Sequence, residues 1–183
     1  MTDVKPELIY YWERYKPGKL PPGEDLAAMR QGVGREPMEI PKMWPFYVRV
    51  TADGMMTASL RAEHAALGLF GVHQQSQRTL MHWPGVPWGD ALQALRSSGR
   101  YSEAALDRRV AQAVTATDLI EVTQHLRGLV SMLKTLPNPQ GLDYSLLVDD
   151  LTSWQYPRGA ARVRRHLGLR FFRPSTNSKE TSA

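Results

Sequence analysis

The feature that most constrains the fold is an apolar repeat with helical spacing in the segment after Asp118. Five aliphatic residues recur at offsets of 0, +4, +7, +8 and +11, which places them on one face of an α-helix. They are Val122, Leu126, Leu129, Val130 and Leu133. Asp118, with Glu121 three residues later, is typical of the capping box that begins a helix. The prolines and glycine of residues 137–141 then end it, so a long amphipathic helix is predicted here.

Similar periodic patterns cover most of the remaining chain. They predict further helices over residues 3–15, 25–31, 58–76, 88–96, 102–114, 143–154 and 158–171. N-cap residues stand at several of their starts: Thr57 or Ser59, Ser102 and Asp143. Residues 49–51 can be read as a short strand, but no nearby segment offers a convincing partner. We therefore predict an all-α fold.

A break at Ser97, Ser98 and Gly99 divides the predicted helices into two groups. We expect two small helical bundles in tandem: an N-terminal helical domain over residues 1–98 and a C-terminal helical bundle over 99–173. The tail over 174–183 is short and polar, and we expect it to be disordered.

The composition excludes several classes of protein. The 183 residues include no cysteine, so disulfide scaffolds, cysteine zinc sites and cysteine nucleophiles are excluded. The first fifteen residues carry acids and no apolar core, unlike a signal peptide. No apolar run approaches the ~20 residues needed to cross a bilayer, and we expect a cytoplasmic protein without a membrane partner. The formal charge of +5 favours an acidic partner.

Residues suited to catalysis, metals or cofactors do not form a recognisable motif. The five histidines show neither HExxH nor a pair four residues apart on one helix, so we read them as surface or core side chains. Asp149 and Asp150 are adjacent and would point about 100° apart on a helix. Phosphate-binding loops and a GxSxG motif are also absent. We predict no enzyme activity, no metal and no cofactor.

Basic residues gather on helix faces that carry no acid. On the helix after Asp118, one polar stripe holds Gln124, Arg127, Ser131 and Lys134. On the last helix, Arg158, Arg162 and Arg165 are spaced by four and three residues, and residues 158–173 contain six arginines and no acid. Like charges at this spacing destabilise a helix by a few tenths of a kcal/mol unless a partner of opposite charge neutralises them. Phosphate is a natural partner for guanidinium groups. A solvated face, or ion pairs with Asp149 and Asp150, would explain the same pattern.

The order of several segments resembles a known family, the CasB-type small subunit of the type I-E CRISPR surveillance complex, Cascade. The matching segments occur in family order over nearly the whole chain, and each is weakly specific alone. They are LAAMRQGVG at 26–34, AALGLFGVHQQSQ at 65–77, GDALQAL at 89–95, DRRV at 107–110, HLRGLVSMLK at 125–134, LDYSLLVDDLTSW at 142–154 and VRRHLGLRFF at 163–172. Departures from the family pattern fall at packing positions: Trp88, Val110 and His166.

The resemblance implies a non-catalytic subunit that holds nucleic acid. The family contacts guide RNA and target DNA through their backbones, supports their pairing and keeps the displaced strand apart, while base pairing reads the sequence. The implied partners are the backbone and large subunits of Cascade and a second copy of the chain. The family's basic contacts correspond to Arg30, Arg61, Arg109 and Arg127. The charge pattern alone adds Arg108, Lys134, Arg162 and Arg165.

Three other functions remain open at this point. A sequence-specific helical DNA-binding regulator would need two helices joined by a short turn, and the connections here read as long and rich in proline. A metal-dependent nuclease would need an acid cluster. A protein-interaction bundle would use the arginines to meet acidic partners.

Overall fold

The computed structural model describes residues 8–174, and every regular element in that range is helical. Two 3-10 helices, η1 (Tyr11–Arg14) and η2 (Pro41–Phe46), accompany the α-helices. The α-helices are α1 (Gly23–Gly32), α2 (Ala58–Gln74), α3 (Trp88–Ser97), α4 (Glu103–Thr115), α5 (Leu119–Leu133), α6 (Tyr144–Trp154) and α7 (Pro157–Phe171). An isolated bridge between His82 and Leu142 is the β-type pairing in this range. The predicted all-α fold is confirmed.

Local capping explains where several helices begin. Thr57 accepts a hydrogen bond from the Leu60 N–H at the start of α2, and Asp143 accepts from two backbone N–H groups at the start of α6. Asp118 caps α5 by accepting from the Glu121 N–H at 2.8 Å. The predicted reciprocal bond of the capping box was wrong, because the Glu121 carboxylate accepts from the Thr117 N–H at 2.7 Å, one residue earlier.

One predicted helix forms only in part, and a strand that the sequence offered without a partner is absent. Of the helix expected over residues 3–15, the described part contains only the short η1, because Trp12 is anchored elsewhere: its indole N–H donates to Ser145 Oγ at 3.0 Å. The short strand considered at 49–51 is also absent. The backbone N–H groups of Val48 and Arg49 instead donate to the buried carboxylate of Glu63 on α2, which ties this segment to a helix.

Helices α1 and α2 cross at very close range because α2 presents glycines to α1. A Cβ atom at Gly71 would lie 2.7 Å from Met29 Cβ and 3.0 Å from the Leu26 carbonyl oxygen. At Gly68 it would lie 2.8 Å from Val33 Cγ2. Any side chain larger than hydrogen would therefore push α1 away from α2.

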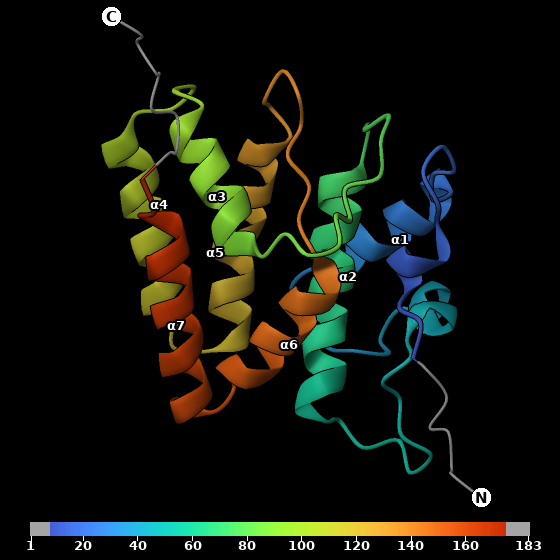
Figure 1. Cartoon of the computed structure of the whole chain (residues 1–183). Coiled ribbons are helices and arrows are strands. Elements are labelled where there is room, and N and C mark those ends of the chain that lie inside the picture. The colour runs from blue at the N-terminus through green and yellow to red at the C-terminus, as the bar shows by residue number, and fades with distance from the viewer. Residues whose placement is uncertain (1–7, 175–183) are drawn as a thin grey trace, which may run out of the picture.

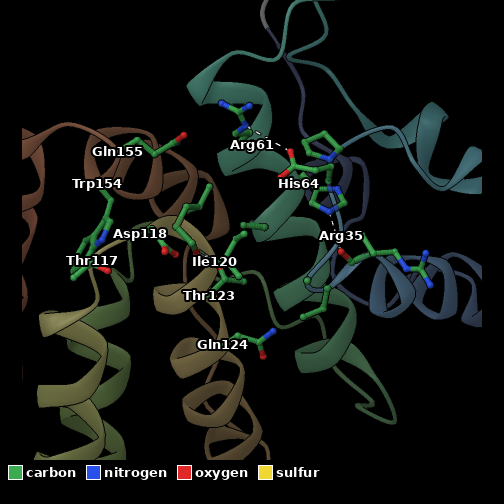
Figure 2. Close-up of a pocket in the computed structure, with 17 residues that line it drawn as sticks. Arg35, Arg61, His64, Thr117, Asp118, Ile120, Thr123, Gln124, Trp154 and Gln155 are labelled. Carbon is green, nitrogen blue, oxygen red and sulfur yellow. Dashed lines mark hydrogen bonds and ion pairs between the residues drawn. The ribbon is translucent and has the colours of Figure 1, made fainter.

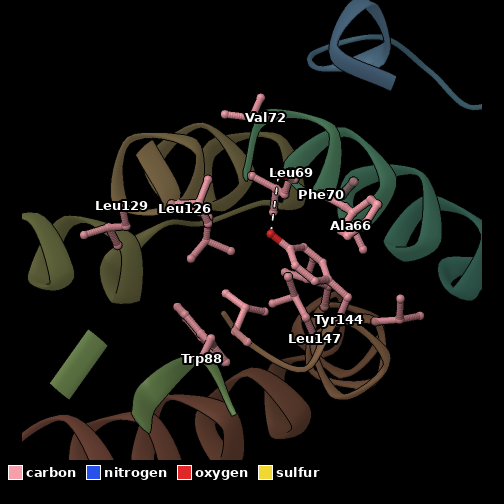
Figure 3. Close-up of a cluster of buried hydrophobic side chains, with 14 of the residues drawn as sticks. Ala66, Leu69, Phe70, Val72, Trp88, Leu126, Leu129, Tyr144 and Leu147 are labelled. Atoms are coloured by element: carbon pink, nitrogen blue, oxygen red, sulfur yellow. Dashed lines mark hydrogen bonds between the residues drawn. The ribbon is translucent and has the colours of Figure 1, made fainter. Parts of the chain in front are cut away.

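One hydrophobic cluster extends over both predicted domains. Helix α2 packs against α1, α5 and α6, and α3 packs against α7; in Figure 1, α6 runs between the α4–α5–α7 side and the α1–α2 side. Figure 3 shows Phe70 of α2, Leu126 of α5 and Tyr144 of α6 meeting in this cluster. The division at residues 98 and 99 stays a prediction, because a shared core does not reveal whether each part folds alone. Of the predicted disordered tail, residues 175–183 lie outside the described residues.

Candidate nucleic-acid interface

The polar stripe predicted on α5 is present at the surface. Gln124, Arg127 and Ser131 are exposed, and Lys134 follows at the end of the helix, half-buried. The acid on this helix, Glu121, accepts two hydrogen bonds from Thr117. The stripe lies on a capped helix that packs between α2 and α4. The core therefore fixes the positions of its Cα and Cβ atoms.

Lys134 joins the stripe to the end of α2. Its ammonium donates to the Val72 carbonyl oxygen at 2.8 Å, one of the last-turn carbonyls that lack a partner within α2. Partial burial and, next, the charge of Arg30 lower the pKa of Lys134. Arg30, in the last turn of α1, lies near the same end of α2, because a Cβ atom at Gly71, the residue before Val72, would be 3.3 Å from the Arg30 backbone nitrogen.

Arg109 of α4 lies against the opposite flank of α5. A Cβ atom at Gly128 would be 3.7 Å from Arg109 Nη1, and Gly128 directly follows Arg127 in the chain. We call the four cations Arg30, Arg109, Arg127 and Lys134 the α5 basic face. Among residues 8–174, no carboxylate forms an ion pair with any of them. The face therefore keeps its charge available to a partner.

Arg108 and Arg61 have different surroundings. Arg108 is exposed beside Arg109 on α4. Arg61, near the start of α2, has Nε 3.7 Å from Glu36 Oε2, and the two side chains are 45% and 55% exposed. An ion pair that long and that exposed contributes little to stability, so Arg61 can exchange Glu36 for another anion.

A cavity of about 430 Å³ separates Arg61 from the beginning of α5. Its walls come from the connection at residues 32–37, from α2, from the first turns of α5 and from the end of α6. Figure 2 shows Arg61 and His64 on one side and Ile120, Thr123 and Gln124 on the other. The walls of this cavity come from four separate segments, so no local sequence pattern indicates it.

The α7 row is separate from the α5 basic face. Helix α7 packs against α3 and α6. Arg165 and Arg158 are exposed, while Arg162 donates to Ser153 Oγ at 3.0 Å. Two other arginines of α7, outside the row, are bound internally: Arg164 to the Ala116 carbonyl oxygen and the Trp154 ring, and Arg170 to Asp90. The structure thus does not bring Arg162 and Arg165 together with Arg127.

The alternative of ion pairs between this row and Asp149 or Asp150 is not observed among residues 8–174. Asp149 is exposed, whereas Asp150 accepts a hydrogen bond from the Trp88 indole N–H at 2.9 Å. Burial raises the pKa of Asp150, and nearby Arg162 and His166 act in the opposite direction. Asp150 therefore serves the packing of α3 on α6.

The buried histidines are structural. His64 has Nδ1 2.7 Å from the Tyr47 hydroxyl and Nε2 2.9 Å from the Gly32 carbonyl oxygen, which suits a neutral ring that donates to the carbonyl and accepts from the hydroxyl. Burial lowers the pKa of His64, His73 and His82. Within residues 8–174, no group of three or more histidine, aspartate or glutamate side chains is placed to hold a metal ion. None of the helices in this range has the length and apolar character required to span a bilayer.

The fold and this site define a class: a small all-α protein with a basic face whose cations form no ion pair with the described residues. The sequence matches the family model of CRISPR-associated protein Cse2 over residues 25–172. The structure is similar to the crystal structure of CasB from Thermobifida fusca, with 30% sequence identity, a TM-score of 0.65, and coverage of 81% of this chain and 84% of that chain. No curated relative matches by sequence.

The chain belongs to the CRISPR-associated Cse2 family. This confirms the resemblance to CasB-type small subunits, and with it a role in the type I-E CRISPR surveillance complex. Members of this family are structural subunits of that complex.

Proposed function

We propose that the chain binds the sugar–phosphate backbone of nucleic acid along the α5 basic face, without sequence preference. In the surveillance complex this contact stabilises the pairing of guide RNA with target DNA and holds the displaced strand. The observation that carries the proposal is the grouping of Arg30, Arg109, Arg127 and Lys134 from three helices, with no carboxylate partner within residues 8–174.

The chemistry of the face suits phosphate. Guanidinium groups donate in a fork that matches phosphate oxygens, and contacts to phosphate position a protein on nucleic acid without reading sequence. The side chains extend from helices that are packed against their neighbours, so the backbone positions of the cations are set before nucleic acid binds. The entropy lost on binding is therefore small.

The remaining predicted cations have secondary roles in binding. Arg108 and Arg61 extend the positive region at the α4 and α2 sides, and both are exposed. Arg162 and Arg165 on α7 form a second contact area, for another stretch of backbone or for an acidic surface of a neighbouring subunit. The proposed partners also include the backbone and large subunits and a second copy of the chain. We propose that the subunit acts in the cytoplasm and performs no catalysis.

The structure bears directly on the rival function of a sequence-specific regulator. The expectation that the connections are long and rich in proline was wrong for three pairs of helices. Residues 98–102 join α3 to α4, residues 116–118 join α4 to α5, and residues 155–156 join α6 to α7, all without proline. A recognition helix must enter the major groove, about 12 Å wide, along an open side. Helix α5 is flanked by α2 and α4, and its first turns form a wall of the cavity, which leaves it too enclosed to enter a groove.

The salt dependence of binding tests the proposal. On duplex DNA, each neutralised phosphate contributes about 0.9 to the slope of log affinity against log salt concentration. We expect Arg127→Ala and Arg109→Ala each to lower that slope by about one unit without changing sequence preference. Lys19→Ala is the matched control, since Lys19 is exposed in the connection before α1. A flat salt response of the wild-type protein, or equal slopes for Arg127→Ala and Lys19→Ala, would contradict the proposal.

A further inference from the structure

We propose that the cavity between α2 and α5 receives a single unstacked base from a nucleic-acid strand bound on the α5 basic face. This inference rests on the proposed function, because the face supplies the strand. The cavity of about 430 Å³ lies in the size range of small-molecule sites, about 300–1,000 Å³.

The cavity and the basic face share a boundary on α5. Gln124 belongs to the polar stripe and also lines the cavity, and Arg127 follows it by three residues, or about 4.5 Å along the helix. A phosphate held by Arg127 therefore lies beside the opening. Ile120, 59% exposed, continues the same stripe and lines the cavity too, which gives an arriving ring an apolar surface.

Unused hydrogen-bonding groups line the cavity. The Gln124 side-chain amide, which has both a donor and an acceptor, makes no hydrogen bond within residues 8–174. Asp118 uses Oδ1 to cap α5, which leaves its other oxygen to accept. Base edges offer donors and acceptors together, so a base satisfies this mixed set, whereas an apolar protein side chain would leave it unpaired.

The charges at the cavity select a neutral ligand. Arg35 and Arg61 are balanced there by Glu36 and Asp118, so the cavity itself is a poor phosphate site, in contrast to the α5 basic face. The guanidinium of Arg35 is exposed and has no partner within residues 8–174. Unstacked bases pack on guanidinium planes in protein complexes with single strands. The two sites thus divide a nucleotide between them, phosphate on the face and base in the cavity.

Two oligonucleotides with equal charge separate these contributions. The full-length protein is titrated with a short oligothymidylate and with an abasic strand of the same number of phosphates. A base in the cavity should make the oligothymidylate bind at least about fivefold more tightly, the lower end of the effect of one stacked base. The variant Gln124→Trp, which fills the cavity, should abolish this ratio and leave the salt slope unchanged. Ser131→Trp is the matched control, because it adds the same side chain to the same stripe, outside the cavity lining.

A fluorescent base supplies a second readout. 2-Aminopurine placed in the oligothymidylate should change its emission on binding to wild type and to Ser131→Trp, and should not do so with Gln124→Trp. Equal affinities of wild type for the base-containing and abasic strands, together with a normal salt slope, would overturn the cavity proposal and leave the proposed function standing. If Gln124→Trp keeps the base-dependent ratio but no longer associates with the protein subunits of the complex, the cavity accommodates a protein side chain and the proposal fails. A flat salt slope would remove both proposals.

Discussion

The crossing of α1 and α2 predicts opposite outcomes for the same substitution at two helical glycines. At Gly71 an added Cβ would be 2.7 Å from Met29 Cβ and 3.0 Å from a backbone oxygen of α1. At Gly168 of α7, nothing lies within 4 Å. Replacing a helical glycine with alanine stabilises a helix by roughly 0.5–1 kcal/mol through backbone entropy alone.

That entropic gain is common to both sites, so the difference between the two variants isolates the steric cost. Overpacking of a close helix contact costs about 1–3 kcal/mol. We therefore expect Gly168→Ala to raise stability by roughly 0.5–1 kcal/mol and Gly71→Ala to be about 1–3 kcal/mol less stable than Gly168→Ala. For a protein of this size the gap corresponds to about 2–12 °C in the unfolding temperature.

Thermal unfolding followed by circular dichroism at a fixed protein concentration measures this gap. Chemical denaturation gives the same difference as a free energy, provided that the dependence on denaturant is equal for both variants. If Gly71→Ala unfolds at the same temperature as Gly168→Ala, or higher, α1 and α2 are not in the tight contact described here. The placement of Arg30, which depends on that contact, would then also lose its support.

Two further predictions concern buried polar groups. Burial lowers the pKa of His73 to about 4, below the ~6.5 of an unfolded chain. Between these two values the unfolded state binds more protons than the folded state. The free energy of unfolding should therefore fall by roughly 3 kcal/mol as the pH drops from 6.5 to 4. His73→Gln should reduce the slope of unfolding free energy against pH by up to about 1.4 kcal/mol per pH unit, and an unchanged slope would show that His73 is already charged in the fold. Asp143 accepts from the N–H groups of Ser145, Leu146 and Gly85, so Asp143→Ala should cost about 2–4 kcal/mol in denaturant unfolding. A loss below about 0.5 kcal/mol would show that these contacts do not hold α6 in place.

Sequence patterns predicted the helices whose first and last residues are set by neighbouring residues in the chain. Helix α5 follows from an apolar repeat, a capping aspartate and a proline-rich end, all within about six turns of chain. Residues 8–15 have a similar apolar spacing, yet the chain there is fixed by Trp12, whose partner Ser145 lies 133 residues away. Periodicity could not have predicted this, because the bond depends on how distant elements pack.

The same distinction applies to the candidate site. The stripe on α5 could be read from spacing, and Arg127 was therefore found. Lys134 was found in the same way, and Arg30 and Arg109 were named from the family resemblance. Their grouping around α5 could not be predicted, because the proximity of Arg30 to Lys134 and of Arg109 to Gly128 depends on helix packing. On α7, spacing predicted the row of Arg158, Arg162 and Arg165. Spacing could not predict that Arg164 and Arg170 of the same helix contact distant residues, because those bonds depend on how α7 packs.

Lys134 shows why the basic face cannot be assigned to either half of the chain alone. By pattern it is one more cation on α5, but its ammonium is bonded to the Val72 carbonyl oxygen at the end of α2. That bond places a positive charge close to Arg30 of α1. Burial is the larger cause of the lowered pKa of Lys134, and the positive charge of Arg30 adds to it. A folded protein tolerates such repulsion more readily where an anion neutralises it in the working state. A polyanion lying across both side chains would relieve this repulsion, so we expect backbone phosphate to bind where the ends of α1, α2 and α5 meet.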